Sequence, residues 1–270
     1  MDIVRNTFNG GTFEMDYAVF GAGRIPFVIL PGMSLHPVTP SAQAVAARYS
    51  QFLDKCRCYL FDRRRNLPEG FSVQDMAEDT VAVMRALGIA DAFVFGASQG
   101  AMMAMTIAAR HPELVGRLAL CSTAARPSER TVDTMSAWIS LAEAGDAVAL
   151  NNAIFSRVYS PGFRAKYEGA FAALAREGTQ AEMREFAVSA KATMTFELWR
   201  ELSEIKCPLS VFGVDDDTVL GGQGVKDIAT RLGCDPFIYP GQGHAVYDEA
   251  PDFPDRLHSL IPAGQSDIVE

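Results

Sequence analysis

The sequence predicts an α/β fold, in which a mostly parallel sheet of about eight strands is covered by helices and is interrupted by a helical insertion. Short apolar runs alternate with helical segments, which is the order of elements in such folds. The runs are continuously apolar, as expected for strands buried on both faces. Residues 128–203 contain no strand-like run. We therefore expect a core formed by residues 1–127 and 204–270, with residues 128–203 as an inserted helical cap, or lid.

Turn signals and apolar runs define the expected strands. Residues 3–8 and 13–20 form two early strands joined at Gly10-Gly11, which is a hairpin signal. The remaining strands are short apolar segments, and several end at a loop signal such as Pro31-Gly32. These segments are 27–30, 59–61, 92–95, 117–121, 209–212 and 237–239.

Helical periodicity and capping residues define the expected helices. Ser72, with Asp75 three residues later, resembles a capping box, and Gly88 ends that helix. In the core we expect helices over 41–53, 72–87, 99–110, 222–232 and 249–260. In the insertion we expect them near 131–144, 146–157, 162–176, 179–192 and 195–203. A lid is favoured over a separate helical domain, because the sheet needs the strands on both sides of the block.

Composition restricts the class of protein and its partners. The 270 residues are 49% hydrophobic and 21% charged, and the net charge is −9. This acidic balance argues against nucleic-acid or anionic-membrane partners, and no segment is apolar enough to span a bilayer. The first residues show no secretory signal, and five cysteines suggest free thiols in the cytoplasm. No His or Cys lies at zinc spacing from Cys56-Arg57-Cys58, so we expect no metal site.

The candidate nucleophile is Ser98, in Gly96-Ala97-Ser98-Gln99-Gly100. This G-x-S-x-G segment alone is only moderately informative, but it lies between an expected strand and an expected helix. A serine on such a tight turn is exposed at the edge of the sheet, and the helix N-terminus behind it favours developing negative charge. The alternative is a glycine-rich turn with an inert serine.

A serine hydroxyl needs a base, and His244 is the best candidate among the four histidines. It lies in the loop after the last expected strand, at the edge where Ser98 also emerges. His36 follows Pro31-Gly32 and is the alternative base. His111 and His258 lie at helical positions and are expected on the surface.

An acid and two oxyanion donors complete the expected site. Asp215-Asp216-Asp217 follows the strand at 209–212, and the order Ser, Asp, His suits a triad, although a solvated acidic loop is the alternative. The backbone N–H of Gln99 is one expected oxyanion donor. The N–H of Met33, in the loop after Leu30, is the second, and Met33 with Ser34 is expected to line the pocket floor.

These segments together resemble the α/β-hydrolase fold superfamily, in particular lid-containing serine hydrolases similar to esterases. The resemblance covers nearly the whole chain and includes Leu30-Pro31-Gly32-Met33, Phe61-Asp62-Arg63 and Gly243-His244. In many relatives the acid lies three residues after the glycine that closes its strand, which implies Asp216, with Asp215 as the fallback. The resemblance also implies a lid after the strand at 117–121.

The chain departs from the family pattern at two loops. Many relatives have His-Gly where this chain has Pro31-Gly32. Many also have Asp-x-Arg-Gly-x-Gly where this chain has Asp62-Arg63-Arg64-Arg65-Asn66. This basic loop either attracts an acidic substrate or forms salt bridges to the lid through Arg64 and Arg65, and we favour the structural role.

The expected reaction is hydrolysis of a small ester or related acyl compound through an acyl-enzyme on Ser98, without metal or organic cofactor. One alternative is perhydrolase/haloperoxidase-type chemistry or carbon–carbon bond cleavage on the same triad. Another is a ligand-binding or signalling protein with a slow triad. A homo-oligomer is possible. Apolar residues of the expected lid suggest a small-molecule substrate with an apolar part; these residues are Met135, Trp138, Phe155, Phe163, Phe171, Phe186, Met194 and Phe196.

Overall fold

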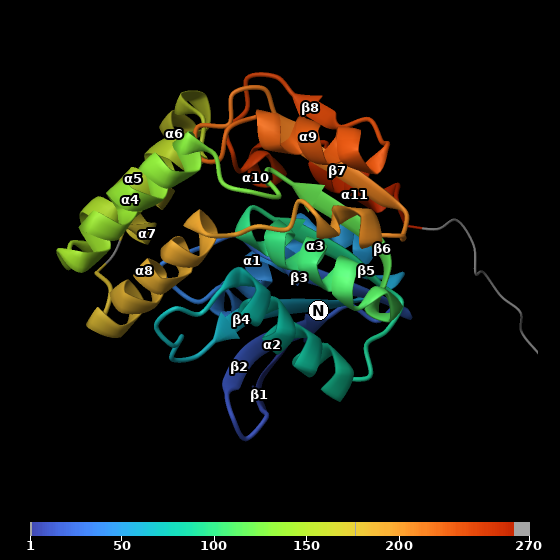
Figure 1. Cartoon of the computed structure of the whole chain (residues 1–270). Helices are drawn as coiled ribbons and strands as arrows, with labels where there is room; N and C mark the ends of the chain where they lie inside the picture. Colours follow the sequence, from blue (N-terminus) through green and yellow to red (C-terminus); the bar gives the residue numbers. More distant parts are fainter. Residues whose placement is uncertain (1, 176, 262–270) are drawn as a thin grey trace, which may run out of the picture.

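A single eight-stranded sheet organises the chain (Figure 1). The computed structural model describes residues 2–175 and 177–261. The strand order is β1-β2-β4-β3-β5-β6-β7-β8. The strands are β1 Val4–Asn9, β2 Glu14–Phe20, β3 Ile25–Leu30, β4 Cys56–Arg64, β5 Ala92–Ala97, β6 Val115–Cys121, β7 Leu209–Val214 and β8 Phe237–Tyr239.

The sheet is mostly parallel, as the sequence predicts. Only β1–β2 and β2–β4 pair in an antiparallel sense, while β4, β3, β5, β6, β7 and β8 are parallel to one another. Strands β3 and β5 are neighbours, with Leu30 opposite Gly96 at their carboxyl ends. The loop after β3 therefore begins beside the turn that carries Ser98, which is where open α/β sheets bind ligands.

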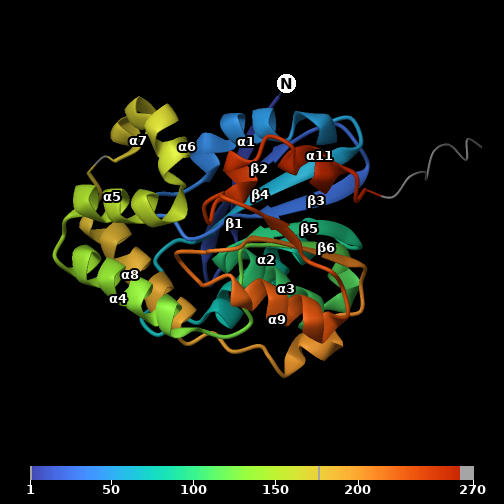
Figure 2. The ribbon, with the colours of Figure 1, turned by 90° about the horizontal axis from the view of Figure 1, so that it is seen from above.

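Helices cover both faces of this sheet. Figure 2 shows α1 (Ala42–Arg48) and α11 (Phe253–His258) on one face. On the other face lie α2 (Val73–Ala86), α3 (Gln99–Arg110) and α9 (Gln223–Leu232). Each face has its own cluster of buried apolar side chains, so the sheet is the middle layer of a three-layer core.

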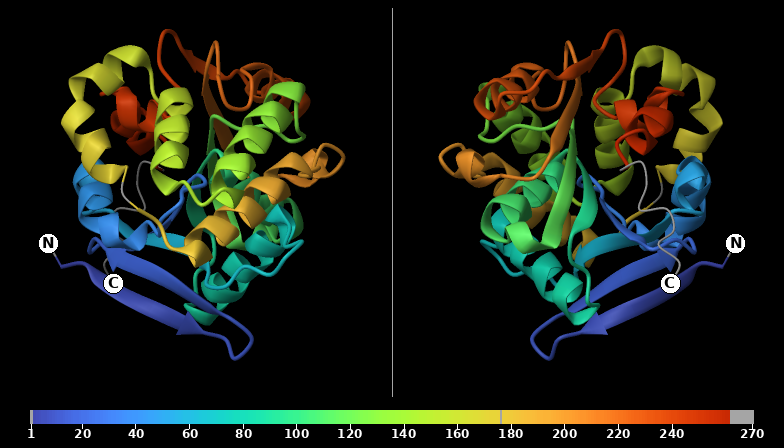
Figure 3. Two further views of the ribbon diagram at one scale, coloured as in Figure 1. Left: turned by 90° about the vertical axis from the view of Figure 1, so that its left-hand side faces the viewer. Right: turned by 90° about the vertical axis from the view of Figure 1, so that its right-hand side faces the viewer.

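Five helices occupy the stretch between β6 and β7. They are α4 Glu129–Glu143, α5 Ala147–Val158, α6 Pro161–Lys166, α7 Glu168–Leu174 and α8 Gln180–Met194. Ser128 and Thr179 begin α4 and α8 with capping boxes, which satisfy backbone N–H groups in the first turn of each helix. Figures 1 and 3 show the five helices gathered at one side of the sheet; we call them the insertion. Trp138 and Phe186 of the insertion belong to the same apolar cluster as the α2–α3 face.

The expected helices differ from the structure in three places. Residues 195–203 form no α-helix, because the N–H of Leu198 donates to the carbonyl of Ala125 instead of to its own segment, at 2.9 Å. The helix expected over 162–176 is divided at Tyr167, because the backbone dihedral angles of this residue are not helical. The helix expected over 249–260 begins only at Phe253, as α11, because Ala250, before Pro251, is extended; a separate short helix, α10 (Val246–Glu249), precedes it.

Two elements follow the sequence expectation closely. The capping box at Ser72 is present: its Oγ accepts from the N–H of Asp75 at 3.0 Å, and Asp75 accepts from the N–H of Ser72 at 2.9 Å. Helix α3 spans 99–110, as expected. Among the described residues, no helix has the length and apolar character needed to cross a membrane.

Candidate active site

Ser98 lies at the sharp turn between β5 and α3. Its backbone is at φ 53 and ψ −123, a conformation that residues other than glycine rarely adopt. The surrounding hydrogen bonds hold it there. The N–H of Ser98 donates to the carbonyl of Cys121 at 2.9 Å, and the carbonyl of Ser98 accepts from Thr123 Oγ1 at 3.1 Å. The tight strand-to-helix turn expected from the sequence is therefore confirmed, with a strained backbone at Ser98.

The small residues of the elbow are required by close backbone approach. A Cβ added to Gly100 would lie 2.0 Å from the carbonyl oxygen of Leu30 and 2.4 Å from that of Pro31. A Cβ added to Gly32 would lie 3.2 Å from Ser98 Cβ and 3.8 Å from Ser98 Oγ. The loop after β3 thus packs directly against the elbow, and Gly32 faces the hydroxyl.

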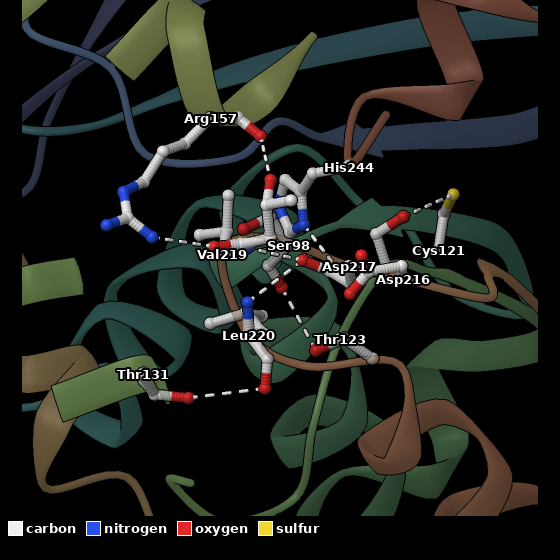
Figure 4. Close-up of polar contacts among 12 residues, drawn as sticks. Ser98, Cys121, Thr123, Thr131, Arg157, Asp216, Asp217, Val219, Leu220 and His244 are labelled. Carbon is white, nitrogen blue, oxygen red and sulfur yellow. Dashed lines mark hydrogen bonds and ion pairs between the residues drawn. The ribbon is translucent and has the colours of Figure 1, made fainter. Parts of the chain in front are cut away.

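The carboxylate beside His244 is that of Asp217, and this corrects the expectation for Asp216. Asp217 Oδ2 lies 2.7 Å from His244 Nδ1, and the two side chains are only 4% and 3% exposed (Figure 4). The Asp216 side chain is 85% exposed, 3.5 Å from Arg130. Asp215 is 63% exposed and faces Lys226 at 4.0 Å. Strand β7 continues past Gly213 to Val214, so the inward-facing carboxylate lies one residue later than the family spacing implies.

Asp217 is held as a carboxylate by several donors. Its Oδ1 accepts from the N–H groups of Val219 at 2.8 Å and Leu220 at 2.9 Å. Burial by itself raises the pKa of Asp217, but the charge of His244, its hydrogen bond and these two backbone donors outweigh burial, so the pKa is lowered overall. A buried anion at Nδ1 fixes the ring orientation of His244.

The loop that carries His244 is attached to the insertion. The N–H of Ala245 donates to the carbonyl of Val158 at 2.9 Å. The buried carboxylate of Glu249 links two backbone groups: it accepts from the N–H of Gly243 at 3.1 Å and from the N–H of Ser160 at 2.6 Å. The end of α5 and the start of α6 therefore contact the backbone on both sides of His244.

The two expected oxyanion donors lie on either side of this site. Gln99 is the first residue of α3, and Met33 follows Gly32, which packs against Ser98. Within the described part of the chain, neither backbone N–H has a hydrogen-bond partner. The Gln99 side chain instead contacts the insertion: its Nε2 donates to the carbonyl of Ser189 at 2.9 Å and to Thr193 Oγ1 at 2.8 Å.

The structure thus brings Ser98, Asp217 and His244 to one edge of the sheet, from the ends of β5, β7 and β8 (Figure 4). Ser98 Oγ forms no hydrogen bond with His244 here, which is common before substrate binds. His36 is not part of this group, because its Nδ1 lies 2.9 Å from Glu182.

The remaining histidines also lie elsewhere. His111 contacts Glu78 at 3.0 Å, and the ring of His258 packs edge-on against Phe52. Among the described residues, no group of three or more His, Cys, Asp or Glu side chains is arranged to hold a metal ion.

A cavity of about 110 Å³ adjoins the oxyanion loop. Gly32, Met33 and Gln99 line it on the side of the elbow. Its other walls come from 34–38, from 62–67 and from α8, and they include apolar side chains, which are Leu35, Leu67 and Phe186. Of the eight apolar residues singled out in the insertion, Phe186 is the one that lines this cavity.

The side chains of Arg64 and Arg65 in the basic loop pair with the core rather than with the insertion. Arg64 Nε lies 3.5 Å from Asp79 of α2. Arg65 pairs with Glu14 at 3.1 Å and Asp16 at 2.8 Å, both on β2. The expected salt bridges from these two arginines to the lid are therefore wrong, because both guanidinium groups pair with carboxylates of the core.

Sequence reasoning missed three residues around the site. Asp217 differs from its acidic neighbours because two buried apolar residues follow it at 219 and 220, and this apolar context is the signal that distinguishes it. Thr123 and Glu249 contact the backbone of the catalytic loops, and nothing in the sequence pattern identifies such contacts.

Curated relatives match a part of the chain. The provisionally named carbamate hydrolase RutD of Caulobacter segnis is 40% identical over 74 residues, which are 26% of this chain and 28% of that protein. The provisionally named non-heme bromoperoxidase BpoC of Mycobacterium tuberculosis gives the same identity and the same coverage. The chain thus matches little more than a quarter of the length of these curated relatives.

A solved structure and a family match extend the similarity to most of the chain. The enol-lactonase of Burkholderia xenovorans LB400 superposes with a TM-score of 0.81 at 20% identity, covering 94% of this chain and 98% of the enzyme, which shows a common fold. The alpha/beta hydrolase fold family matches residues 48–251. Membership of this family supports hydrolase activity. The chain belongs to the α/β-hydrolase fold family.

Proposed function

We propose that this protein is a serine hydrolase that cleaves a small ester or related acyl compound. The observation that carries the proposal is the buried Asp217–His244 pair, at 2.7 Å, on the same sheet edge as the strained Ser98. A buried carboxylate on Nδ1 of a histidine is the arrangement that lets the ring accept a proton at Nε2.

The proposed reaction proceeds through an acyl-enzyme. Ser98 Oγ attacks the substrate carbonyl while His244 Nε2 takes its proton, and Asp217 stabilises the resulting imidazolium. The N–H groups of Gln99 and Met33 would stabilise the oxyanion of the tetrahedral intermediate. The leaving alcohol takes the proton from His244, and water then cleaves the acyl-enzyme by the same steps in reverse order.

The insertion is proposed as a lid over this edge of the sheet. Its support is the set of contacts between the insertion and the catalytic loops, at Ser189 and Thr193 on one side and at Val158 and Ser160 on the other. The apolar wall formed by Leu35, Leu67 and Phe186 supports a substrate with an apolar part.

The compartment is proposed from the cysteines. All five are free thiols, and burial is the main factor raising the pKa of each one, so they are poorly reactive. Free thiols are typical of the cytoplasm, where we propose that the enzyme acts.

The test is covalent labelling with a fluorophosphonate probe, alongside turnover of p-nitrophenyl esters of increasing acyl length. Wild type should be labelled and should turn over esters, whereas Ser98→Ala should lose labelling and about 10⁶-fold in kcat. A melting curve should show that the variant is still folded. Labelling or undiminished turnover in Ser98→Ala would exclude Ser98 as the nucleophile. Labelling of wild type without turnover would favour a binding protein or another reaction.

A peroxide-dependent reaction is a second candidate, favoured by the similarity to BpoC. In that reaction hydrogen peroxide, rather than water, attacks the acyl-enzyme and releases a peracid. A halide-oxidation assay with acetate, hydrogen peroxide and bromide distinguishes the two. Bromination that requires Ser98 and exceeds ester hydrolysis under the same conditions would make perhydrolysis the main activity.

A further inference from the structure

The basic loop contains three consecutive arginines, and only Arg63 lacks an ionic partner. Arg64 pairs with Asp79, and Arg65 pairs with Glu14 and Asp16. Within the described part of the chain no carboxylate lies within 4.0 Å of the Arg63 guanidinium, which instead contacts two uncharged oxygens. A cation that is partly removed from water without a counter-ion is costly, so its position requires an explanation.

Most hydrogen-bond donors of Arg63 are unused. Nη2 donates to the carbonyl of Pro31 at 2.9 Å and to Gln99 Oε1 at 3.2 Å. Nε is buried without a partner, and Nη1 forms no hydrogen bond with any described residue. Burial lowers the pKa of Arg63 to about 10, although the nearby charge of Asp62 acts in the opposite direction. The group nevertheless stays charged at neutral pH and can still donate to a planar anion.

The adjacent carboxylate of Asp62 does not neutralise Arg63, because other groups occupy its oxygens. Oδ1 accepts from the N–H of Val38 at 2.6 Å. Oδ2 accepts from the N–H and the hydroxyl of Thr39, at 3.2 and 2.6 Å. These neutral donors hold Asp62 against the loop after β3 and leave the guanidinium available.

Every other carboxylate that lines the cavity also has its own partner. Glu182 contacts His36 at 2.9 Å, and Asp16 pairs with Arg65. Glu185 accepts from the N–H of Asn66 at 2.9 Å. Arg63 is therefore the cation of the described cavity wall that has no ionic partner.

The loop after β3 lies between Arg63 and Ser98. The guanidinium is bonded to Pro31, and the next residue, Gly32, faces Ser98 Oγ. Gly32, Met33 and Arg63 line the same space of about 110 Å³. Since one water molecule takes roughly 30 Å³ in the liquid, this space has room for a carboxylate with part of its carbon chain.

We propose that Arg63 binds a carboxylate of the substrate, so that the preferred esters carry an acid group a few bonds away from the reacting carbonyl. This inference rests on the proposed ester hydrolysis and adds the class of substrate. The apolar side chains of Leu35, Leu67 and Phe186 would contact the carbon chain that separates the two groups.

The test compares matched pairs of p-nitrophenyl esters. One member is the half ester of succinic, glutaric or adipic acid, and the other is the same acyl group with its free acid masked as a methyl ester. Rates are corrected for spontaneous hydrolysis, which the free carboxylate accelerates. The preference is measured as the ratio of kcat/KM for the charged member to kcat/KM for the masked member, at the acyl length where this ratio is largest. Wild type should prefer the charged member. Arg63→Gln should lower this ratio about 10- to 100-fold, the range expected for a charge-assisted hydrogen bond.

Arg65→Gln is the matched control. It removes the same charge from the same loop, but its guanidinium is already paired with Glu14 and Asp16. The ratio should change less than about threefold, as expected for an exposed, paired charge. An equal fall in Arg63→Gln and Arg65→Gln would overturn the proposal, because it would indicate a general effect of charge. An unchanged ratio in Arg63→Gln would overturn it as well.

A binding measurement separates this proposal from the proposed reaction. Glutarate is titrated by calorimetry into Ser98→Ala and into the same variant with Arg63→Gln. Binding that requires Arg63 supports the carboxylate site even if no ester is hydrolysed, whereas no binding at millimolar glutarate overturns it. If Arg63→Gln does not fold, a protection experiment on wild type decides instead. It compares how well glutarate and its neutral dimethyl ester protect the enzyme from labelling by the fluorophosphonate. Equal protection by the two compounds overturns the proposal.

Discussion

The catalytic edge of the sheet and the insertion are held in different ways. At the edge, backbone hydrogen bonds to neighbouring strands fix the loops: Ser98 bonds to the end of β6, and Ser122 bonds to Phe212 of β7. In the insertion, side chains make many of the contacts, and their burial is uneven. Helices α4 and α8 are well buried, whereas α6 and α7 contain no buried residue. The loop of the candidate nucleophile Ser98 is thus held by backbone hydrogen bonds to neighbouring strands. In the insertion, α6 and α7 are held less firmly, because they contain no buried residue.

This difference suggests a division of roles within the insertion. Helix α8 is attached to the core through the buried Gln99 side chain and lines the cavity with Phe186. The part-exposed aromatic side chains of α6 and α7 pack on the end of α5: the ring centroid of Phe163 lies 5.4 Å from that of Tyr159, and that of Phe171 lies 5.0 Å from that of Phe155. Regions with few buried apolar contacts open most easily. We therefore expect α6 and α7 to control access while α8 shapes the site.

Apart from loss of the Ser98 hydroxyl, the largest expected effect would come from removing the charge of the buried Asp217 carboxylate. Asp217→Asn should lower kcat about 10⁴-fold, because the wrong tautomer of His244 is then favoured. Asp216→Asn should change kcat less than about threefold, because its side chain is 85% exposed. Kinetics with a p-nitrophenyl ester measure both. A larger loss in Asp216→Asn than in Asp217→Asn would break the assignment of the acid.

The substitution Asp217→Asn should also change how the free energy of unfolding depends on pH. The pKa of Asp217 is lowered in the folded protein, so its contribution to stability is present above the ordinary value, about 3.9, and is lost as the pH falls through the folded value. The difference in unfolding free energy between wild type and Asp217→Asn should thus be largest near neutral pH and shrink below about pH 4. Denaturant titrations at several pH values measure it. A difference that grows in acid would contradict the lowered pKa.

The contrast between Asp216 and Asp217 also shows what the sequence can predict. The positions of the strands, the elbow and the place of His244 follow from periodicity and from loops at the carboxyl ends of strands, which are local signals. The choice among three adjacent carboxylates depends on where β7 ends, and a shift of one residue reverses which side chain points inward. The Glu249 contacts to Gly243 and Ser160 join segments far apart in sequence, so no local pattern predicts them.

A second prediction compares packing within the insertion. Trp138 of α4 is 3% exposed, and Tyr167 beside α7 is 40% exposed. Trp138→Ala should lower the free energy of unfolding by about 3–5 kcal/mol, because it leaves a cavity in the shared core. Tyr167→Ala should cost about 1 kcal/mol or less, mainly through lost aromatic contacts. Urea titrations measure both changes. Equal losses would mean that α6 and α7 are held as firmly as α4, and the proposed division of roles would fail.

A smaller effect on kcat is expected where the two regions meet, at Glu249. Its carboxylate accepts from the N–H of Gly243 beside His244 and from the N–H of Ser160 in the insertion. Glu249→Gln replaces one acceptor oxygen with a donor, so one of these N–H groups loses its partner and the His244 loop is held less firmly. We expect kcat to fall on the order of tenfold, about 1.4 kcal/mol in the barrier.

The kinetic pattern separates positioning of His244 from a merely structural role. If Glu249 positions the base, kcat falls while KM changes little, and the pH of half-maximal fluorophosphonate labelling shifts. Asp248→Asn is the matched control, because Asp248 accepts from Tyr159 Oη at 2.9 Å and contacts neither N–H group that Glu249 holds. A change in KM alone, or an equal loss in both variants, would show that the contact orders the insertion without positioning His244, and the insertion and the catalytic edge would then act independently.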